Sequence, residues 1–315
     1  MIIWVLGAGG LLGSAITRAG RADQRHSVFA GSPLPWNDHQ NFIHVLNADA
    51  RRFRAECGDQ DWAVIWAAGL ASVSSSSDAT GSEARALQSV VTALSANLPE
   101  GRGAFFLSSS AGGVYAGSEK PPFSIETEPQ PLSPYGELKL EQEAISTSSL
   151  AGRCPVVIGR FSNIYGPGQD LGKLQGLISR LALSAVTKDP VNIFVSLDTL
   201  RDYIYVDDAA RIVLALLERT VSASSAANSE IQIIASGQPV SLGHLINVMQ
   251  DIARIRIPVA MGAHASAASQ SRDLRLRPTD SAITERYAST TLPSGTKAVY
   301  LDVLTRFQQA TTHSA

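Results

Sequence analysis

The sequence IIWVLGAGGLLG, residues 2–13, decides the fold. Its first five residues form an unbroken apolar run, which indicates a strand buried on both faces of a parallel sheet. Gly7, Gly10 and Gly13 follow at three-residue spacing, and an apolar helix pattern comes next. Glycines permit a tight turn and close approach of a phosphate, and the N–H groups that open the helix favour an anion. This strand–turn–helix predicts a dinucleotide pyrophosphate site.

Composition excludes several classes of protein. The chain has 315 residues, a net charge of -2 and 17% charged residues with no basic block, so nucleic acid is not an expected partner. It contains no run of eighteen apolar residues, so no membrane span is expected. The N-terminus lacks signal-peptide features, and Cys57 and Cys154 support no disulfide framework. We therefore expect a reduced, cytoplasmic protein.

Apolar runs and helical patterns alternate along the first half of the chain. The runs at residues 27–30, 42–46, 62–68, 104–109, 155–160 and 231–236 are predicted as further strands. Helical patterns lie between several of them, at residues 11–19, 83–95 and 135–146. Strand–helix alternation predicts an α/β fold, a Rossmann-like doubly wound parallel sheet with a smaller C-terminal substrate-binding part.

The rhythm changes after residue 160. Helices are predicted near residues 174–186, 209–218 and 242–255, and small polar residues predict loops at 72–82, 221–229 and 262–271. We predict a dinucleotide-binding domain at residues 1–160. Residues 161–315 are expected to form mainly the substrate-binding part, with some segments returning to the first domain.

The tip of the second predicted strand bears on cofactor choice. A carboxylate there would bind the adenosine ribose hydroxyls and favour NAD, but residues 30–32 are Ala, Gly and Ser. This leaves room for the 2′-phosphate of NADP, although no arginine follows at the tip, and Arg51 and Arg52 contribute only if the fold brings them close. The choice between NAD and NADP stays open. Asp49, after the third predicted strand, is a candidate for the adenine amino group or an ordinary loop aspartate.

The segment SPYGELK, residues 133–139, places a tyrosine four residues before a lysine, on one face of a helix that Pro134 can open. Free tyrosine has a pKa of about 10, and a nearby ammonium favours its phenolate. Ser110 lies at the end of the fifth predicted strand, where its hydroxyl can hold a substrate oxygen against Tyr135. Glycine turn, strand-end serine and Tyr/Lys helix follow the order that a nicotinamide enzyme needs, so we interpret Tyr135 and Lys139 as an acid–base pair.

With GAGGLLG, WAAG, SSSAGGVY, SPYGELK, RFSNIYGPGQ and RDYIYVDDAA, the chain resembles the extended short-chain dehydrogenase/reductase family, in its sugar-nucleotide epimerase/dehydratase branch; LRPTD adds a weaker match. The resemblance implies that Tyr135 is the acid–base, Lys139 its partner and ribose clamp, and Ser110 the substrate-hydroxyl contact. It also implies substrate binding by Ser110, Asn163, Arg201 and Arg277, the arginines on the diphosphate. The predicted cofactor contacts are Gly7, Gly10, Leu11, Leu12, Gly13, Asp49, Ala67, Ala68, Gly69, Ser108, Tyr135, Lys139 and Phe161.

The chain departs from the family pattern at three places. The ribose carboxylate is missing, the family's usual asparagine is not evident in the helix after WAAG, and the glycine before RDY is absent from FVSLDTLRDY. Family dehydratases carry an Asp-Glu pair after the strand-end hydroxyl, where this chain has Ala111 and Gly112. Dehydration is therefore set aside.

The SSSAGGVY form resembles the epimerase motif, so we predict a nucleoside-diphosphate-sugar 4-epimerase that acts by transient C4 oxidation. The alternative is a 4-keto sugar-nucleotide reductase that uses the same residues in one direction with an exchangeable cofactor. A reading from another class is a non-catalytic dinucleotide sensor, which tends to lack the tyrosine or lysine. A nucleotide-sugar partner and a homodimer follow from the resemblance, and no metal site is predicted.

Overall fold

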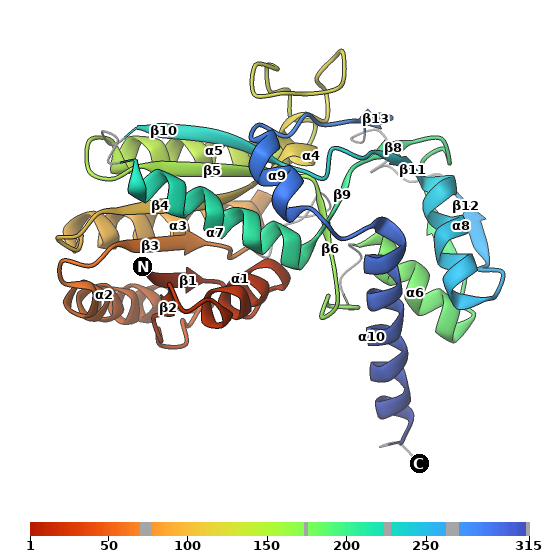
Figure 1. The fold of residues 1–315 in the computed structure, drawn as a ribbon, viewed down its shortest axis with the longest axis horizontal. Coiled ribbons are helices and arrows are strands. Elements are labelled where there is room, and N and C mark those ends of the chain that lie inside the picture. The colour runs from red at the N-terminus through yellow and green to blue at the C-terminus, as the bar shows by residue number, and fades with distance from the viewer. Residues whose placement is uncertain (70–76, 173–175, 224–227, 263–270, 313–315) are drawn as a thin grey trace.

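The computed structural model describes residues 1–69, 77–172, 176–223, 228–262 and 271–312. Six parallel strands form the main sheet in the order β10-β5-β4-β3-β1-β2 (Figure 1). Their bounds are β1 Ile2–Leu6, β2 Ser27–Val28, β3 Trp62–Trp66, β4 Gly103–Ser110, β5 Val156–Phe161 and β10 Ser229–Ile234. The predicted α/β fold class with a Rossmann-like parallel sheet is confirmed.

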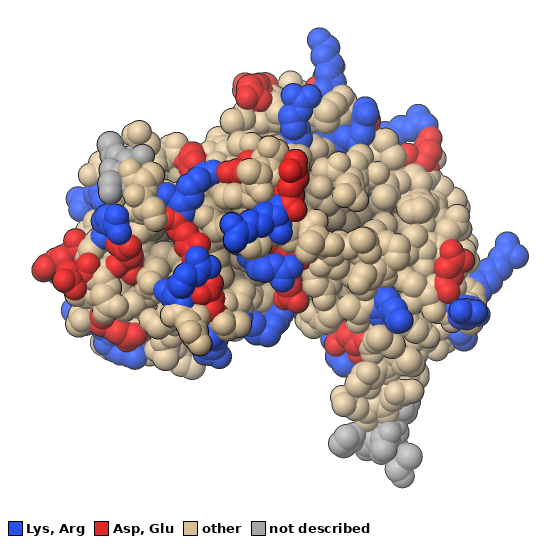
Figure 2. Space-filling model, in the orientation of Figure 1, with Lys and Arg blue, Asp and Glu red and all other residues tan. Residues whose placement is uncertain are grey.

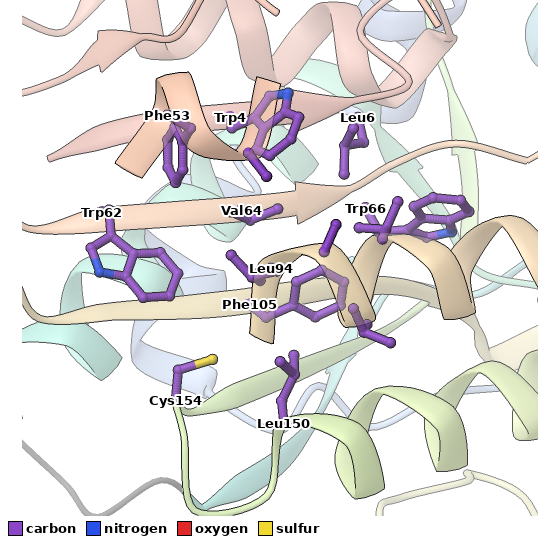
Figure 3. Close-up of a cluster of buried hydrophobic side chains, with 14 of the residues drawn as sticks. Trp4, Leu6, Phe53, Trp62, Val64, Trp66, Leu94, Phe105, Leu150 and Cys154 are labelled. Atoms are coloured by element: carbon purple, nitrogen blue, oxygen red, sulfur yellow. The ribbon is translucent and has the colours of Figure 1, made fainter. Parts of the chain in front are cut away.

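Helices cover both faces of this sheet, as the unbroken apolar strands predict. Residues of β1 alternate between two cores: Ile2, Trp4 and Leu6 enter one, Ile3 and Val5 the other. The first core packs against α2 His39–Cys57, α3 Ser77–Ala96 and α5 Pro134–Leu150, and Figure 3 shows its aromatic centre. The second packs against α1 Leu11–Ala22 and α7 Val206–Ser222.

One predicted strand is wrong. Residues 42–46 lie inside α2, which begins after Asp38, whose side chain accepts a hydrogen bond from the Asn41 N–H. The buried residues of α2 recur every three or four positions: Phe42, Leu46, Asp49, Ala50, Phe53 and Cys57. That helical period outweighs the short apolar run FIHVL, because it extends over nineteen residues.

A second group of elements lies beside the carboxyl ends of the main strands (Figure 1). Three helices, α6 Leu177–Thr187, α8 Leu242–Ala253 and α10 Leu292–Thr312, pack around a third core. Short strands accompany them: β6 Asn163–Tyr165 with β9 Tyr203–Tyr205, β7 Val191–Ile193 with β12 Val259–Met261, and β8 Leu200–Arg201 between β11 Val240–Ser241 and β13 Asp273–Leu274. Two further helices are α4 Ala111–Val114 and α9 Ser281–Tyr287.

The helix predictions are confirmed, whereas the loop predictions are confirmed only in part. Residues 77–82 begin α3 instead of continuing a loop, while 70–76 lie outside the described residues, as do 224–227 and 263–270 of the other two predicted loops. Cys57 and Cys154 are both free and buried. Among the described residues, the helices are too short or too polar to cross a membrane. Figure 2 shows basic and acidic side chains interspersed on one face.

Candidate functional site

The glycine turn is shaped by its contact with the end of β3. Gly7 has a φ of +94°, and a Cβ there would lie 2.5 Å from the Ala68 backbone nitrogen. Only glycine fits this position, because the left-handed backbone and the close approach both exclude a side chain. Gly10 then starts α1 without any side-chain cap, so backbone N–H groups of the first turn keep their capacity to bind an anion. The turn and Ala67-Ala68 thus fit a dinucleotide pyrophosphate.

The tip of β2 carries a cation that the sequence did not place there. Arg52, on α2, donates to the Ala30 carbonyl oxygen at 3.2 Å, and its guanidinium lies 5.2 Å from the centre of the Phe29 ring. Asp49 is buried beside it and accepts hydrogen bonds from the Ser32 N–H at 2.6 Å and from Arg52 at 2.6 Å. Asp49 therefore lies in a helix rather than after a strand, and the group presented to solvent at the tip is Arg52, whose side chain is 54% exposed.

The candidate serine and the candidate tyrosine both contact the short turn at Gly113. Ser110 ends β4 and caps α4, where its hydroxyl oxygen accepts a hydrogen bond from the Gly113 N–H at 3.1 Å. A Cβ on Gly113 would lie only 3.1 Å from the Tyr135 ring, so glycine allows the ring to pack directly on this turn. The fold therefore brings the Ser110 hydroxyl and the Tyr135 ring next to the same residue, Gly113.

Helix α5 begins where the sequence predicts. The Ser133 hydroxyl accepts from the Gly136 N–H at 3.3 Å, and Pro134 occupies the first turn, where its missing N–H costs nothing. Tyr135 is therefore held in the first turn, half-buried, while Lys139 lies one turn further in and is buried. The Lys139 ammonium lies 5.4 Å from the centre of the Tyr135 ring.

Lys139 belongs to a buried triad that the sequence did not reveal. Its ammonium donates to the Glu83 carboxylate of α3 at 3.1 Å and to the Gln142 amide oxygen at 2.9 Å. The Gln142 amide nitrogen donates to the same Glu83 oxygen at 2.9 Å. Glu83 lies in the helix after WAAG, in which the family's asparagine is not evident. The ion pair between Glu83 and Lys139 therefore lies beside the candidate tyrosine.

A second buried ion pair, between Arg160 and Glu143, links β5 to α5. Arg160 of β5 forms two hydrogen bonds with Glu143, at 3.0 and 2.6 Å, and a third with the Tyr115 hydroxyl at 2.6 Å. Ser109 donates to Glu143 at 2.5 Å. Burial opposes the charged guanidinium, yet the Glu143 carboxylate raises the pKa of Arg160 above its usual value. This network ties α5 to the strand ends that carry Ser110 and Phe161, which are paired in register.

Two of the candidate substrate-binding residues, Asn163 and Arg201, lie on the short strands β6 and β8. Asn163 is exposed at the start of β6 and donates to the Asp202 carbonyl oxygen at 2.9 Å. Arg201 is buried on β8, and burial lowers the pKa of its guanidinium. It is paired in register with Leu274, whose side chain approaches Gly112 of α4. Arg201 therefore lies near the Ser110 turn.

Arg277 lies further along the chain that leaves β13. Its side chain is exposed, and its backbone N–H donates to the Phe123 carbonyl oxygen at 2.8 Å. The Ser124 hydroxyl, with a smaller contribution from Arg277, lowers the pKa of Glu126. The structure thus places Arg277 on an exposed segment beside Glu126, whereas Arg201 is buried close to α4.

Gathered at the carboxyl edge of the sheet are the glycine turn, the ends of β3, β4 and β5, and the first turns of α5. The predicted residues at this edge are Gly7, Gly10, Leu11, Leu12, Gly13, Ala67, Ala68, Gly69, Ser108, Ser110, Tyr135, Lys139 and Phe161. Sequence reasoning missed Glu83, Gln142 and the position of Arg52. A buried polar triad of this kind has no local signal, because its members come from helices about sixty residues apart.

Comparisons with known proteins place this geometry in context. The model of the NAD dependent epimerase/dehydratase family matches residues 3–230. The chain is 36% identical over 118 residues to a dTDP-L-rhamnose 4-epimerase of Burkholderia thailandensis, covering 37% of this chain and 31% of that protein. It is 30% identical over 145 residues to a dTDP-4-dehydro-6-deoxyglucose reductase of Escherichia coli, covering 45% and 43%. The matches thus span less than half the length of these curated relatives.

The fold also matches solved structures. A UDP-glucose 4-epimerase of Thermotoga maritima, solved with UDP-glucose, superposes with a TM-score of 0.79. The alignment covers 98% of this chain and 100% of that chain at 20% identity. At this identity the likeness shows the shared fold.

Proposed function

Since the chain belongs to the NAD dependent epimerase/dehydratase family, we propose that it is an NAD(P)-dependent nucleoside-diphosphate-sugar 4-epimerase that acts by transient oxidation at C4. One observation carries the proposal. Gly113 lets the Tyr135 ring pack against the turn that Ser110 caps, so the tyrosine ring and the serine hydroxyl both lie beside this glycine. A phenol and a hydroxyl carried beside the same turn suit the binding of one sugar hydroxyl.

The chemistry follows from these positions. A nicotinamide dinucleotide held by the glycine turn and Ala67-Ala68 would accept the C4 hydride and later return it. Tyr135 takes the proton of the C4 hydroxyl, and Ser110 hydrogen-bonds the same oxygen and holds it in place. Lys139 stabilises the ionised phenol through its positive charge. When the keto-sugar has rotated within the site and the hydride has returned to the opposite face of C4, Tyr135 returns the proton to the C4 oxygen.

The turn after Ser110 argues against elimination of water from the sugar. Its next residues, Ala111 and Gly112, have no group that can remove the C5 proton or protonate the leaving C6 hydroxyl. Their small size also leaves space beside Gly113, where a Cβ on Gly112 would meet only Leu274 at 3.9 Å. An open turn suits a sugar that must present both faces.

Release of the bound nucleotide tests the epimerase proposal. The purified protein is denatured, and any released nucleotide is identified by mass spectrometry. An epimerase recycles its cofactor in place, so we expect stoichiometric NAD or NADP. Tyr135→Phe should retain that nucleotide and the fold but lose turnover, whereas full turnover by this variant would contradict the assignment.

A 4-keto sugar-nucleotide reductase is the second candidate, and Arg52 favours it. An exposed guanidinium at the β2 tip, where the Asp49 carboxylate is buried, suits the 2′-phosphate of NADPH better than two ribose hydroxyls. Protein that purifies empty and then binds NADPH would favour this candidate. Arg52→Ala should then weaken NADPH binding at least tenfold and leave NADH binding within twofold, with Arg51→Ala as the matched control.

Two further parts of the proposal concern partners. We propose that Asn163 and Arg201 bind the nucleotide-sugar and its diphosphate, with Arg277 contributing from its exposed segment. A buried guanidinium near the Ser110 turn supports this role for Arg201. A homodimer, formed through α3 and α5, is proposed from the family resemblance, and light scattering during size-exclusion chromatography tests it.

A further inference from the structure

The ion pair between Glu83 and Lys139 is buried, with side chains only 8% and 7% exposed. It joins α3 to α5 at the level of the candidate tyrosine. A buried ammonium and carboxylate each lose their hydration, so such a pair persists only where geometry and further hydrogen bonds compensate. The pair therefore calls for an explanation beyond general stability.

Gln142 closes the arrangement into a ring of three hydrogen bonds. It is fully buried, accepts from the Lys139 ammonium at 2.9 Å and donates to Glu83 at 2.9 Å. An ammonium has three N–H groups, and this ring directs two of them toward α3 and α5. The direction of the third N–H is thereby fixed.

Glu83 also borders the predicted cofactor side of the site. A Cβ on Gly69, at the end of WAAG, would lie 3.0 Å from a Glu83 carboxylate oxygen. The carboxylate thus lies next to the exposed Gly69 backbone that follows β3, and it also contacts Lys139. A residue in this place can govern where the ammonium points relative to both Tyr135 and the strand end.

We propose that Glu83 is a positioning residue, which fixes the Lys139 ammonium beside Tyr135 and at the cofactor edge of β3. This inference deepens the proposed function, since Lys139 is the acid–base partner there. The carboxylate holds the buried ammonium in place through the ion pair, and without it the ammonium loses that partner in a buried site. Glu83 acts through Lys139 and not on the substrate.

The test compares E83Q and E83D with the matched control Glu141→Gln, an exposed glutamate on α5. In E83Q we expect kcat to fall about a hundredfold while the KM for the sugar nucleotide stays within about twofold, because Asn163 and Arg201 are untouched. E83D should recover part of the lost kcat, since it keeps the charge at a shorter reach. E141Q should equal the parent protein in both constants.

Cofactor affinity separates this inference from the proposed function. If the parent protein turns over no sugar nucleotide, the proposed function fails, and NAD(P)H binding then decides the role of Glu83. Binding at least tenfold weaker in E83Q than in E141Q supports positioning of Lys139. If the parent protein is inactive, equal NAD(P)H binding by E83Q and E141Q would overturn the inference. If the parent protein is active, an unchanged kcat in E83Q would overturn it. If E83Q does not fold, E83D alone decides by the same measurements.

Discussion

Replacing Arg160 with methionine should destabilise the protein strongly, because it leaves a buried carboxylate without its cation. Arg160 and Glu143 have side chains 4% and 8% exposed, and the guanidinium makes three of the four hydrogen bonds in the network. Breaking a buried pair from one side costs roughly 3–5 kcal/mol. We therefore expect R160M to lower the free energy of unfolding by about 4 kcal/mol.

A second substitution tests whether the unpaired charge is the cause. Adding Glu143→Gln to R160M removes the buried charge and keeps an oxygen that can accept from Ser109. We expect the double variant to be about 2 kcal/mol more stable than R160M alone, because neutral replacement of a buried pair is far less costly than breaking it. The control is Arg102→Met, which breaks an exposed pair with Asp61 and should cost below about 1 kcal/mol.

Equilibrium unfolding in guanidinium chloride measures these differences, with fluorescence of the four tryptophans as the signal. The reasoning is refuted if R160M loses no more stability than R102M, or if the double variant is less stable than R160M. Either result would mean that the buried pair is held by packing around it and not by its charges.

Three more predictions concern other buried groups. Gly113→Ala should lower kcat at least tenfold, because the new methyl group displaces the Tyr135 ring. In the control Gly112→Ala the methyl group meets only Leu274, so kcat should stay within about threefold of the parent value. Equal effects of the two substitutions in steady-state assays would contradict this. Burial raises the pKa of Cys57 and of Cys154 to about 12, so iodoacetamide should label both only after unfolding, and rapid native labelling seen by mass spectrometry would be the opposite result. Burial also lowers the pKa of His26 below its unfolded value of 6.5, so the unfolded chain binds the proton more readily and stability should fall as pH drops below about 6.5, by at most about 1.4 kcal/mol per pH unit. His26→Gln should flatten that dependence in chemical unfolding at pH 5 to 7, and an unchanged slope would exclude His26 as its source.

Local pattern predicted the main sheet because its signals are local. The apolar run at residues 2–6 coincides with β1, and the runs at 62–68 and 104–109 overlap β3 and β4 within a few residues. The helix at 135–146 is likewise found in α5, since Ser133 and Pro134 mark its start in sequence. The run at 42–46 failed because a five-residue window cannot show the helical period of α2.

The interior of the site was less accessible to prediction. Tyr135, Lys139 and Ser110 are marked by spacing along the chain, whereas Glu83 meets Lys139 only when α3 packs on α5. Residues 42–46 belong to the helix α2 and not to a strand. This helix brings Arg52 next to Ala30 and Ser32 at the β2 tip. Contacts that depend on how helices pack leave no trace in a local motif.

The measurement that tests the central claim most directly is turnover at C4. Purified protein without added cofactor is incubated with a panel of UDP- and dTDP-hexoses, and proton NMR follows the configuration at C4, with Tyr135→Phe in parallel. The account predicts that at least one sugar nucleotide equilibrates with its C4 epimer, that no reduced nicotinamide accumulates in solution, and that the variant is inactive. No inversion by protein that carries NAD, or undiminished inversion by Y135F, would contradict it.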